Sequence, residues 1–208
     1  DAEGKALALM RSWMTAMPGE NLSCVGCHDQ GNLSPPTTRH ALALQRPPSE
    51  ITPWRGPVRG FSFDREVQPV LDKFCVGCHN GQEGPGERTP LNFRGDQGAY
   101  VVYNKGNIDG RTIRNASKQE LLGRYGGVFE PSYLALRQFV RVGGLESDLH
   151  VLPPKEFHAD TSELIRILKK GHHGVQLDAE AWDRLVTWID LNAPAHGSWS
   201  EVTRIPGN

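Results

Sequence analysis

The sequence predicts a mainly α-helical fold with extensive loops, and two observations favour this class. Apolar residues recur at helical spacing in several short stretches that end at glycine or proline. The 208 residues also include 23 glycines and 15 prolines, a content that favours many loops and short regular elements. Hydrophobic residues make up 38% of the chain, enough for a modest core that a large buried cofactor would extend.

The first third of the chain predicts one helix followed by an irregular segment. A short amphipathic helix is expected over residues 5–17, before Pro18, with an apolar stripe formed by Leu7, Met10, Met14 and Met17. Residues 31–60 carry six prolines, which exclude a continuous helix or a central strand. We expect this segment to be an ordered wrap or a linker.

A second helix is predicted over residues 62–74. Its apolar face consists of Val67, Val70, Leu71 and Phe74. Because proline past the first turn removes a helical hydrogen bond, Pro69 predicts that the helix begins at Gln68 or bends there. Shorter helices are expected over 117–122 and 131–140, the latter with proline at its first position.

The last third predicts two further helices with clear ends. Asp160 and Glu163 resemble a capping box before a helix that Gly171 ends. Asp178 is expected to cap the final helix, which ends near Asn192 and Pro194. The apolar stripe predicted for that helix consists of Trp182, Leu185, Val186 and Ile189.

Charge and hydropathy exclude several kinds of partner. The formal net charge is −1 and no basic run is present, so we expect no nucleic acid and no anionic membrane surface as partners. No stretch approaches the ~20 apolar residues of a membrane span. The first residues lack the charged-then-apolar pattern of a signal peptide, so the chain is expected to be a mature or excised piece.

Two short motifs account for all four cysteines: Cys24-Val-Gly-Cys27-His28 and Cys75-Val-Gly-Cys78-His79. C-x-x-C-H is the pattern of c-type haem attachment, in which two thiols meet the vinyl groups of one haem and the histidine ligates the iron. The sequence therefore predicts two covalently bound haems c, with His28 and His79 as iron ligands. Two disulfides or a zinc site are the alternatives, but neither requires a histidine at the same offset twice.

The second haem needs one more axial ligand or an open position. The order of helix, motif, loops, helix, turn and final helix follows a class I cytochrome c, in which the distal ligand precedes the last helix. Here that stretch contains His172 and His173 but no methionine. We expect His172, or second His173, to complete a bis-histidine iron, with His158 as the main rival. A hydrogen-bonding role in the loop is the more favoured interpretation of His158.

The first haem has too few residues around its motif for a complete fold of its own. We therefore expect residues 1–60 to form a first haem-binding segment with its proline-rich wrap, and 61–208 a cytochrome c-like domain with the second haem. His40 is close enough in sequence to reach the first iron. The three methionines of the first helix and an open or water-bound iron are the alternatives, whereas His150 and His196 are expected at the surface or behind the ligands.

Several of these stretches resemble known families. Residues 67–81, together with 164–194, resemble planctomycete-type cytochrome c domains. Residues 13–28, together with 53–63, resemble the C-terminal dihaem part of the hydrazine synthase alpha subunit and its relatives. Some relatives are joined to domains that resemble sulfatase-modifying factors. The resemblance therefore implies one module of a larger, exported protein.

The resemblance also implies roles for the two haems. The family's second haem is bis-histidine and relays electrons, as expected here for His79. The family's first haem forms hydrazine, with its iron held by a tyrosine shortly after the motif and the motif histidine serving a metal. Residues 29–34 contain no tyrosine, so this chain departs from that pattern and His28 is the expected iron ligand.

These observations favour a module that transfers single electrons between its haems and a redox partner, either another protein or another domain of a parent chain. Because haem c is normally attached outside the bacterial cytoplasm, the expected location is the periplasm or another exported site. The alternative is a sensor of a small gaseous ligand (CO, NO or O2), or a redox enzyme, with an open iron at the first haem.

Overall fold

The computed structural model describes residues 1–7, 45, 47, 53–82, 91–103, 110–122, 124–143, 153–198 and 201. Residues Asp1–Met10 and Arg59–Asn208 form one compact unit, and Arg11–Val58 form another. The helices and strands named below all belong to the first unit. The predicted division at residue 60 concerns which haem each segment binds, and it stays a prediction.

The helix predicted over 62–74 is broken in two, as Pro69 indicated. Helix α1 (Phe63–Glu66) is followed, after Val67, by helix α2 (Gln68–Phe74). Pro69 lies in the first turn of α2, where backbone N–H groups have no partner within the helix, so its missing N–H costs little. The start of α2 at Gln68 confirms one of the two predicted outcomes.

The other helices have mostly the predicted ends. They are α3 (Lys118–Leu121), α4 (Pro131–Arg137), the 3₁₀ turn η2 (Ala159–Thr161), α5 (Glu163–Lys170) and α6 (Ala179–Asp190). Asp178 caps α6 by accepting a hydrogen bond from the Ala181 N–H at 2.8 Å, as predicted. The predicted capping box at Asp160 is wrong, because Asp160 lies in η2 and Ser162 is the residue before α5.

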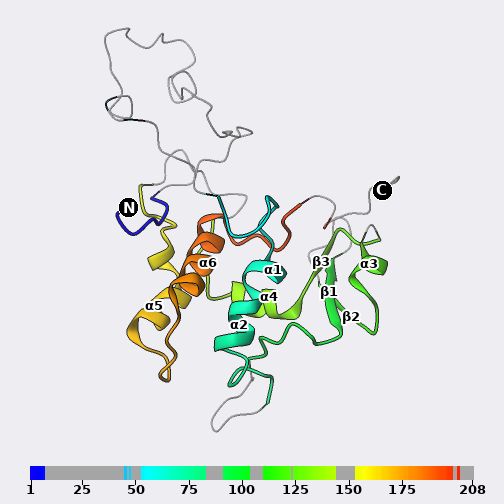
Figure 1. The fold of residues 1–208 in the computed structure, drawn as a ribbon. Coiled ribbons are helices and arrows are strands. Elements are labelled where there is room, and N and C mark those ends of the chain that lie inside the picture. The colour runs from blue at the N-terminus through cyan, green and yellow to red at the C-terminus, as the bar shows by residue number, and fades with distance from the viewer. Residues whose placement is uncertain are drawn as a thin grey trace, which may run out of the picture. The chain divides into compact units, whose positions relative to one another are not determined.

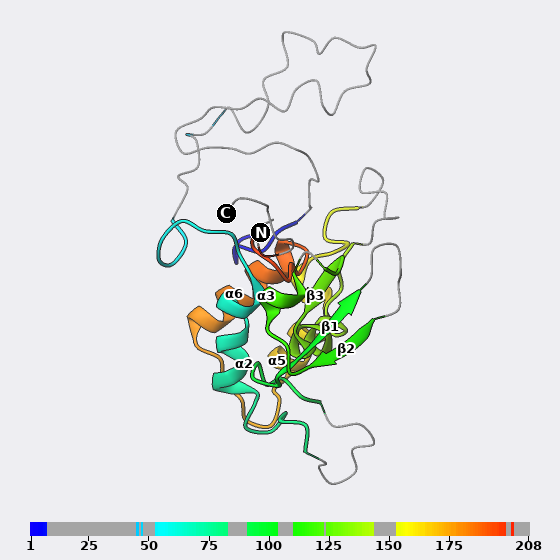
Figure 2. The same ribbon diagram turned by 90° about the vertical axis from the view of Figure 1, so that its right-hand side faces the viewer.

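The described residues also contain an antiparallel sheet that corrects the predicted fold class. Strand β1 (Ala99–Tyr103) pairs with β2 (Arg111–Arg114) on one side and β3 (Gly127–Phe129) on the other. The strands lie side by side in Figure 2. The prediction of a mainly α fold with a class I cytochrome c-like domain is therefore wrong. Tyr100 to Tyr103 consist only of aromatic and β-branched residues, which favour a strand, but cross-strand pairing, a long-range effect, decides their conformation.

The main hydrophobic core lies among the helices. Figure 1 shows α5 and α6 on one side of α1, α2 and α4, with the sheet on the other side. Trp188 of α6 is fully buried, packs on Phe63 of α1, and donates its indole N–H to the Pro194 carbonyl at 2.9 Å. The predicted stripe on α6 faces this core: Leu185 and Ile189 are buried in it, and the half-buried Trp182 and Val186 pack against it.

The N-terminal residues pack on α6 and η2 without forming a helix. Residues 5–7 are not helical, and the rest of the helix predicted over 5–17 lies outside the described residues. Buried Lys5 forms ion pairs with Glu3 and, at 2.9 Å, with Asp160. The Ala6 N–H donates to the Asp190 carboxylate at 2.9 Å, which fixes this segment against the end of α6. None of the described helices is long and apolar enough to span a membrane.

Candidate haem site

The second cysteine motif forms a tight turn directly after α2. The Cys75 N–H donates to the Leu71 carbonyl at 2.8 Å, which continues the helical pattern into the motif. The His79 N–H then donates back to the Cys75 carbonyl at 2.8 Å. Both thiols are free, with Cys78 exposed and Cys75 half-buried. Burial, with a smaller effect of Cys78, raises the pKa of the Cys75 thiol to about 11, unlike the lowered thiol pKa of redox-active C-x-x-C pairs.

The other half of the site comes from the turn after α5. Gly171 ends that helix with a φ of 95°, a conformation that favours glycine, and the chain then reverses. The Val175 N–H donates to the His172 carbonyl at 2.9 Å and closes the turn. This turn places the half-buried His172 against the motif histidine, although 93 positions separate the two residues in sequence.

The imidazoles of His79 and His172 point directly at one another. Their Nε2 atoms are 3.5 Å apart and their ring centres are 5.8 Å apart. A five-membered ring with bonds of about 1.33 Å has its atoms about 1.1 Å from its centre, so both distances are met only if the nitrogens lie on the line between the centres. The ring planes differ by 12°, so the two rings are nearly coplanar and face each other nitrogen to nitrogen.

The two facing nitrogens would be able to hold a metal ion between them. The 3.5 Å separation is about half an ångström less than two imidazole–metal bonds of about 2 Å each, so a small outward movement admits the ion. A direct hydrogen bond between the rings would be long at this distance. No three His, Cys, Asp or Glu side chains in the described part of the chain converge on one metal position. Two facing nitrogens are therefore the donor set that the described residues offer here, and the thiols of the same turn are free.

The structure distinguishes between the two adjacent histidines that the sequence predicts as distal ligands. His173 is exposed and has a φ of 47°, in the left-handed region. Its ring meets the His172 ring edge-on, with the centres 4.8 Å apart and the planes at 81°. His172 is therefore the one directed at His79, while ligation of iron by either residue stays a prediction.

His158 is held in a different set of contacts. It is 6% exposed, and its Nε2 lies 2.8 Å from the Asp1 carboxylate. Its Nδ1 accepts a hydrogen bond from the Asp160 backbone N–H at 3.2 Å. With both ring nitrogens engaged by the N-terminal segment and η2, His158 has none left for iron in this conformation.

The first motif cannot be placed in the same way. Cys24, Cys27, His28 and His40 all lie outside the described residues, as do the three methionines proposed as alternative ligands and His150. The first haem therefore stays a prediction from sequence.

Sequence reasoning missed a residue that contacts His79, Phe93, and a residue that holds Phe93, Gln68. Phe93 packs its ring against the His79 imidazole, with the centres 5.2 Å apart, and Gln68 contacts the Phe93 backbone. Phe93 lies outside the predicted helices, in a short segment that pairs with the chain after the motif. The sequence did contain one signal for Gln68: a polar glutamine stands directly after Val67, at the start of the predicted apolar helix face.

Comparison with known families gives limited support for the resemblance found in the sequence. A family model described as the hydrazine synthase alpha subunit middle domain matches residues 1–29. The matched residues include the first cysteine motif and stop short of the facing histidines. No curated protein and no solved structure gave a significant match. The match supports a relation to hydrazine synthase over this short segment.

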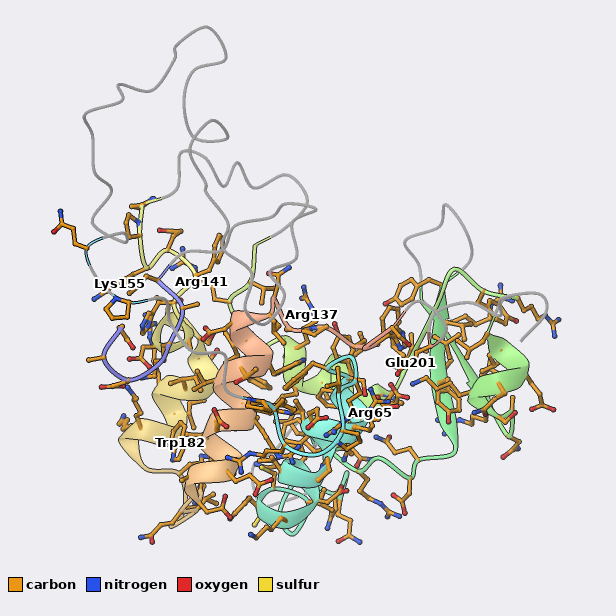
Figure 3. All side chains as sticks on the ribbon, turned by 45° about the horizontal axis from the view of Figure 1, so that its top comes forward. Arg65, Arg137, Arg141, Lys155, Trp182 and Glu201 are labelled. Atoms are coloured by element: carbon orange, nitrogen blue, oxygen red, sulfur yellow. The ribbon has the colours of Figure 1, made fainter. Side chains whose placement is uncertain are left out.

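A half-buried histidine, His196, lies beside the sheet. Its ring packs against Phe129 of β3, with ring centres 5.4 Å apart and the planes tilted by 32°, and neither of its buried ring nitrogens has a hydrogen-bond partner. An ion pair of 2.9 Å between Arg65 and Glu201 joins the following segment to α1 (Figure 3). Burial lowers the pKa of His196 below its ordinary value of 6.5, and the nearby Lys118 lowers it further.

We expect His196→Phe to stabilise the protein, and to do so more at acidic pH. The substitution keeps a ring against Phe129 and removes two unpaired polar atoms, a gain of about 1–3 kcal/mol. Because folding lowers the pKa, the native state loses stability as pH falls through 6.5, despite the opposing charges of Asp64, Glu130 and Glu201. Urea unfolding at pH 7.5 and 5.5, followed by circular dichroism, measures both effects. An equal difference in unfolding free energy between the variant and the wild type at both pH values would contradict the predicted coupling of stability to the pKa of His196.

Proposed function

We propose that this chain is a c-type dihaem module that transfers single electrons. One observation carries the proposal: the imidazoles of His79 and His172 face each other nitrogen to nitrogen, next to two free thiols of a C-x-x-C-H turn. In this proposal the thiols of Cys75 and Cys78 add across two vinyl groups and form thioethers, each sulfur bonding one vinyl carbon and its hydrogen going to the other. Cys24, Cys27 and His28 hold the first haem in the same way.

The facing histidines favour electron transfer over ligand binding at the second haem. Because His79 and His172 would both hold the iron, they would leave no open position for a substrate or a gas, and the chemistry supplied there would be electron exchange without bond making or breaking. Two nitrogen ligands also keep the potential lower than a methionine ligand would. The buried Phe93 packs against the His79 ring and limits the access of water to that side of it.

The proposal includes a redox partner and an exported location. The partner is another protein or another domain of a larger parent chain, and electrons reach it through the exposed side of the motif near Cys78. Haem c is attached outside the bacterial cytoplasm, which supports the periplasm or a comparable exported compartment. The match of residues 1–29 to a hydrazine synthase subunit model agrees with a haem-related function.

The pyridine haemochrome spectrum of protein produced in cells competent for cytochrome maturation tests the proposal. Two haems per chain, both retained after acid–acetone extraction, are expected because thioethers survive that treatment. Low-spin spectra and little change on adding carbon monoxide to the reduced protein are expected for electron transfer. A colourless protein, or rapid stoichiometric carbon monoxide binding by the reduced protein, would overturn it.

Replacing both Cys75 and Cys78 by alanine is expected to remove covalent attachment of the second haem alone. Each haem is attached through its own pair of thiols, so the covalent haem count should fall from two to one per chain. Intact-protein mass spectrometry measures the count. Replacing Cys24 and Cys27 is the matched control, which should also remove one haem, and a variant of all four cysteines should retain none. Two covalent haems after loss of Cys75 and Cys78 would contradict the assignment.

A further inference from the structure

The amide of Gln68 is held by a buried network between three segments of the chain. Gln68 is the first residue of α2 and is 8% exposed. Its Nε2 donates to the Phe93 carbonyl at 2.8 Å and to the Asp72 carboxylate at 2.8 Å. Its Oε1 accepts a hydrogen bond from the fully buried Ser132 hydroxyl of α4, also at 2.8 Å.

These partners allow only one orientation of the amide. The Phe93 carbonyl and the Asp72 carboxylate accept hydrogen bonds and cannot donate, so the amide nitrogen must face them. A flipped amide would place its oxygen against two other oxygens. Gly95 also lies close to this side chain, since a Cβ there would come within 3.0 Å of the Gln68 Cγ and Cδ. The segment containing Phe93 therefore packs tightly against Gln68.

Phe93 connects this network to the motif histidine. Its backbone N–H donates to the His79 carbonyl at 2.9 Å, and two residues earlier the Leu91 carbonyl accepts from the Gly81 N–H at 3.1 Å. The Phe93 ring lies on the His79 ring at an interplanar angle of 58°. Phe93 is thus fixed by Gln68 through its carbonyl and by His79 through its amide, while its ring limits how the imidazole can rotate.

We infer that Gln68 is a positioning residue for His79, acting through Phe93 to keep the His79 ring coplanar with the His172 ring. This inference rests on the proposed function, since it concerns His79 as an iron ligand. Groups that contact a metal-ligating side chain commonly set its orientation, and their loss typically costs about 10–100-fold in metal affinity or activity. Ser132 holds Gln68 in turn, so the relay runs from α4 through α2 to the imidazole.

The test uses Gln68→Leu in the haem-loaded protein. This variant keeps the side-chain volume but loses both donors and the acceptor. Covalent attachment does not depend on Gln68, so the haem count should stay at two. The low-spin electron paramagnetic resonance signal of the second haem and its midpoint potential should shift. We also expect carbon monoxide binding, limited by histidine dissociation, to become about 10-fold faster.

Gln138→Leu is the matched control. Gln138 is exposed and donates to the Ala135 carbonyl at 2.8 Å at the end of α4. The same chemical change therefore occurs at a surface residue that is not part of the relay. Its spectra and carbon monoxide kinetics should equal those of the wild type. Unchanged signals in Gln68→Leu would overturn the inference.

A second variant decides the question if Gln68→Leu fails to fold. Phe93→Leu keeps both backbone hydrogen bonds and removes only the ring from His79, so it should shift the same resonance signal. In a double variant, Gln68→Leu should add little to Phe93→Leu, because both act on one ring. Additive shifts, or none in Phe93→Leu, would contradict the relay. A wild-type protein with fewer than two haems overturns the proposed function itself, before any variant is compared.

Discussion

Replacing His172 by alanine is expected to change the second haem from six-coordinate and low-spin to five-coordinate and high-spin. The Nε2 of His172 is the atom directed at the Nε2 of His79, at 3.5 Å, so its loss opens one axial position. The reduced variant should bind about one more equivalent of carbon monoxide per chain than the wild type. Optical and electron paramagnetic resonance spectra, with a carbon monoxide titration, measure the change.

His173→Ala is the matched control for this prediction. The exposed His173 ring touches His172 edge-on, and its loss should leave the second haem low-spin. His172→Met should restore six-coordination at a higher potential, because thioether ligation raises the potential of haem iron. A high-spin His173→Ala protein together with an unchanged His172→Ala protein would mean that the adjacent histidine is the ligand.

The helices could be predicted where local chemistry decides their ends. Pro69 fixes the break between α1 and α2, Gly171 ends α5, and Asp178 caps α6, and each acts on backbone groups within a few residues of itself. The Asp160 cap failed for the opposite reason. The carboxylate of Asp160 binds Lys5 and Lys169 instead, and an ion pair with the distant N-terminal segment is not visible in a local pattern.

The sheet depends on contacts that sequence periodicity does not contain. Strand β1 is five residues long and its two partners are shorter, so no alternation of side chains extends far enough to be recognised. Val102 and Val128 lie opposite one another and are buried with Leu121 of α3 in a small second core. Such pairing becomes favourable only when the chain brings the strands together.

The candidate site also contains residues that local sequence signals predict and residues that only long-range contacts bring together. The C-x-x-C-H motif points to His79 from sequence alone, and the order of helices indicated that His172 or His173 would approach it. Geometry was needed to distinguish the two: the His172 ring faces His79, whereas the exposed His173 ring meets the His172 ring edge-on. The contact of Phe93 with His79 and that of Gln68 with Phe93 could not be predicted, since tertiary packing alone brings these segments together.

Replacing Glu66 by alanine is expected to destabilise the protein by about 3–5 kcal/mol, because it leaves two guanidinium groups without their shared buried carboxylate. Glu66 is fully buried at the end of α1. Its Oε1 lies 2.6 Å from the Arg59 guanidinium, and its Oε2 accepts from Arg184 of α6. The two arginine side chains are only 25% and 15% exposed, so water replaces the lost carboxylate poorly. Urea unfolding of the haem-loaded protein, followed by circular dichroism, measures the loss.

Glu180→Ala is the control that separates the effect of losing a buried ion pair from the effect of losing an exposed one. Glu180 binds the same guanidinium, at 2.8 Å, but its side chain is 51% exposed and the pair is formed within one helix. Such pairs contribute about 0.3–0.5 kcal/mol, and salt screens them. The effect of Glu180→Ala should therefore be small and should shrink in 0.5 M sodium chloride (about a 4 Å screening length), whereas the effect of Glu66→Ala should persist. Equal losses in the two variants, or a loss at Glu66 that salt abolishes, would mean that the Arg59–Glu66–Arg184 group is solvated in solution and does not join α1 to α6.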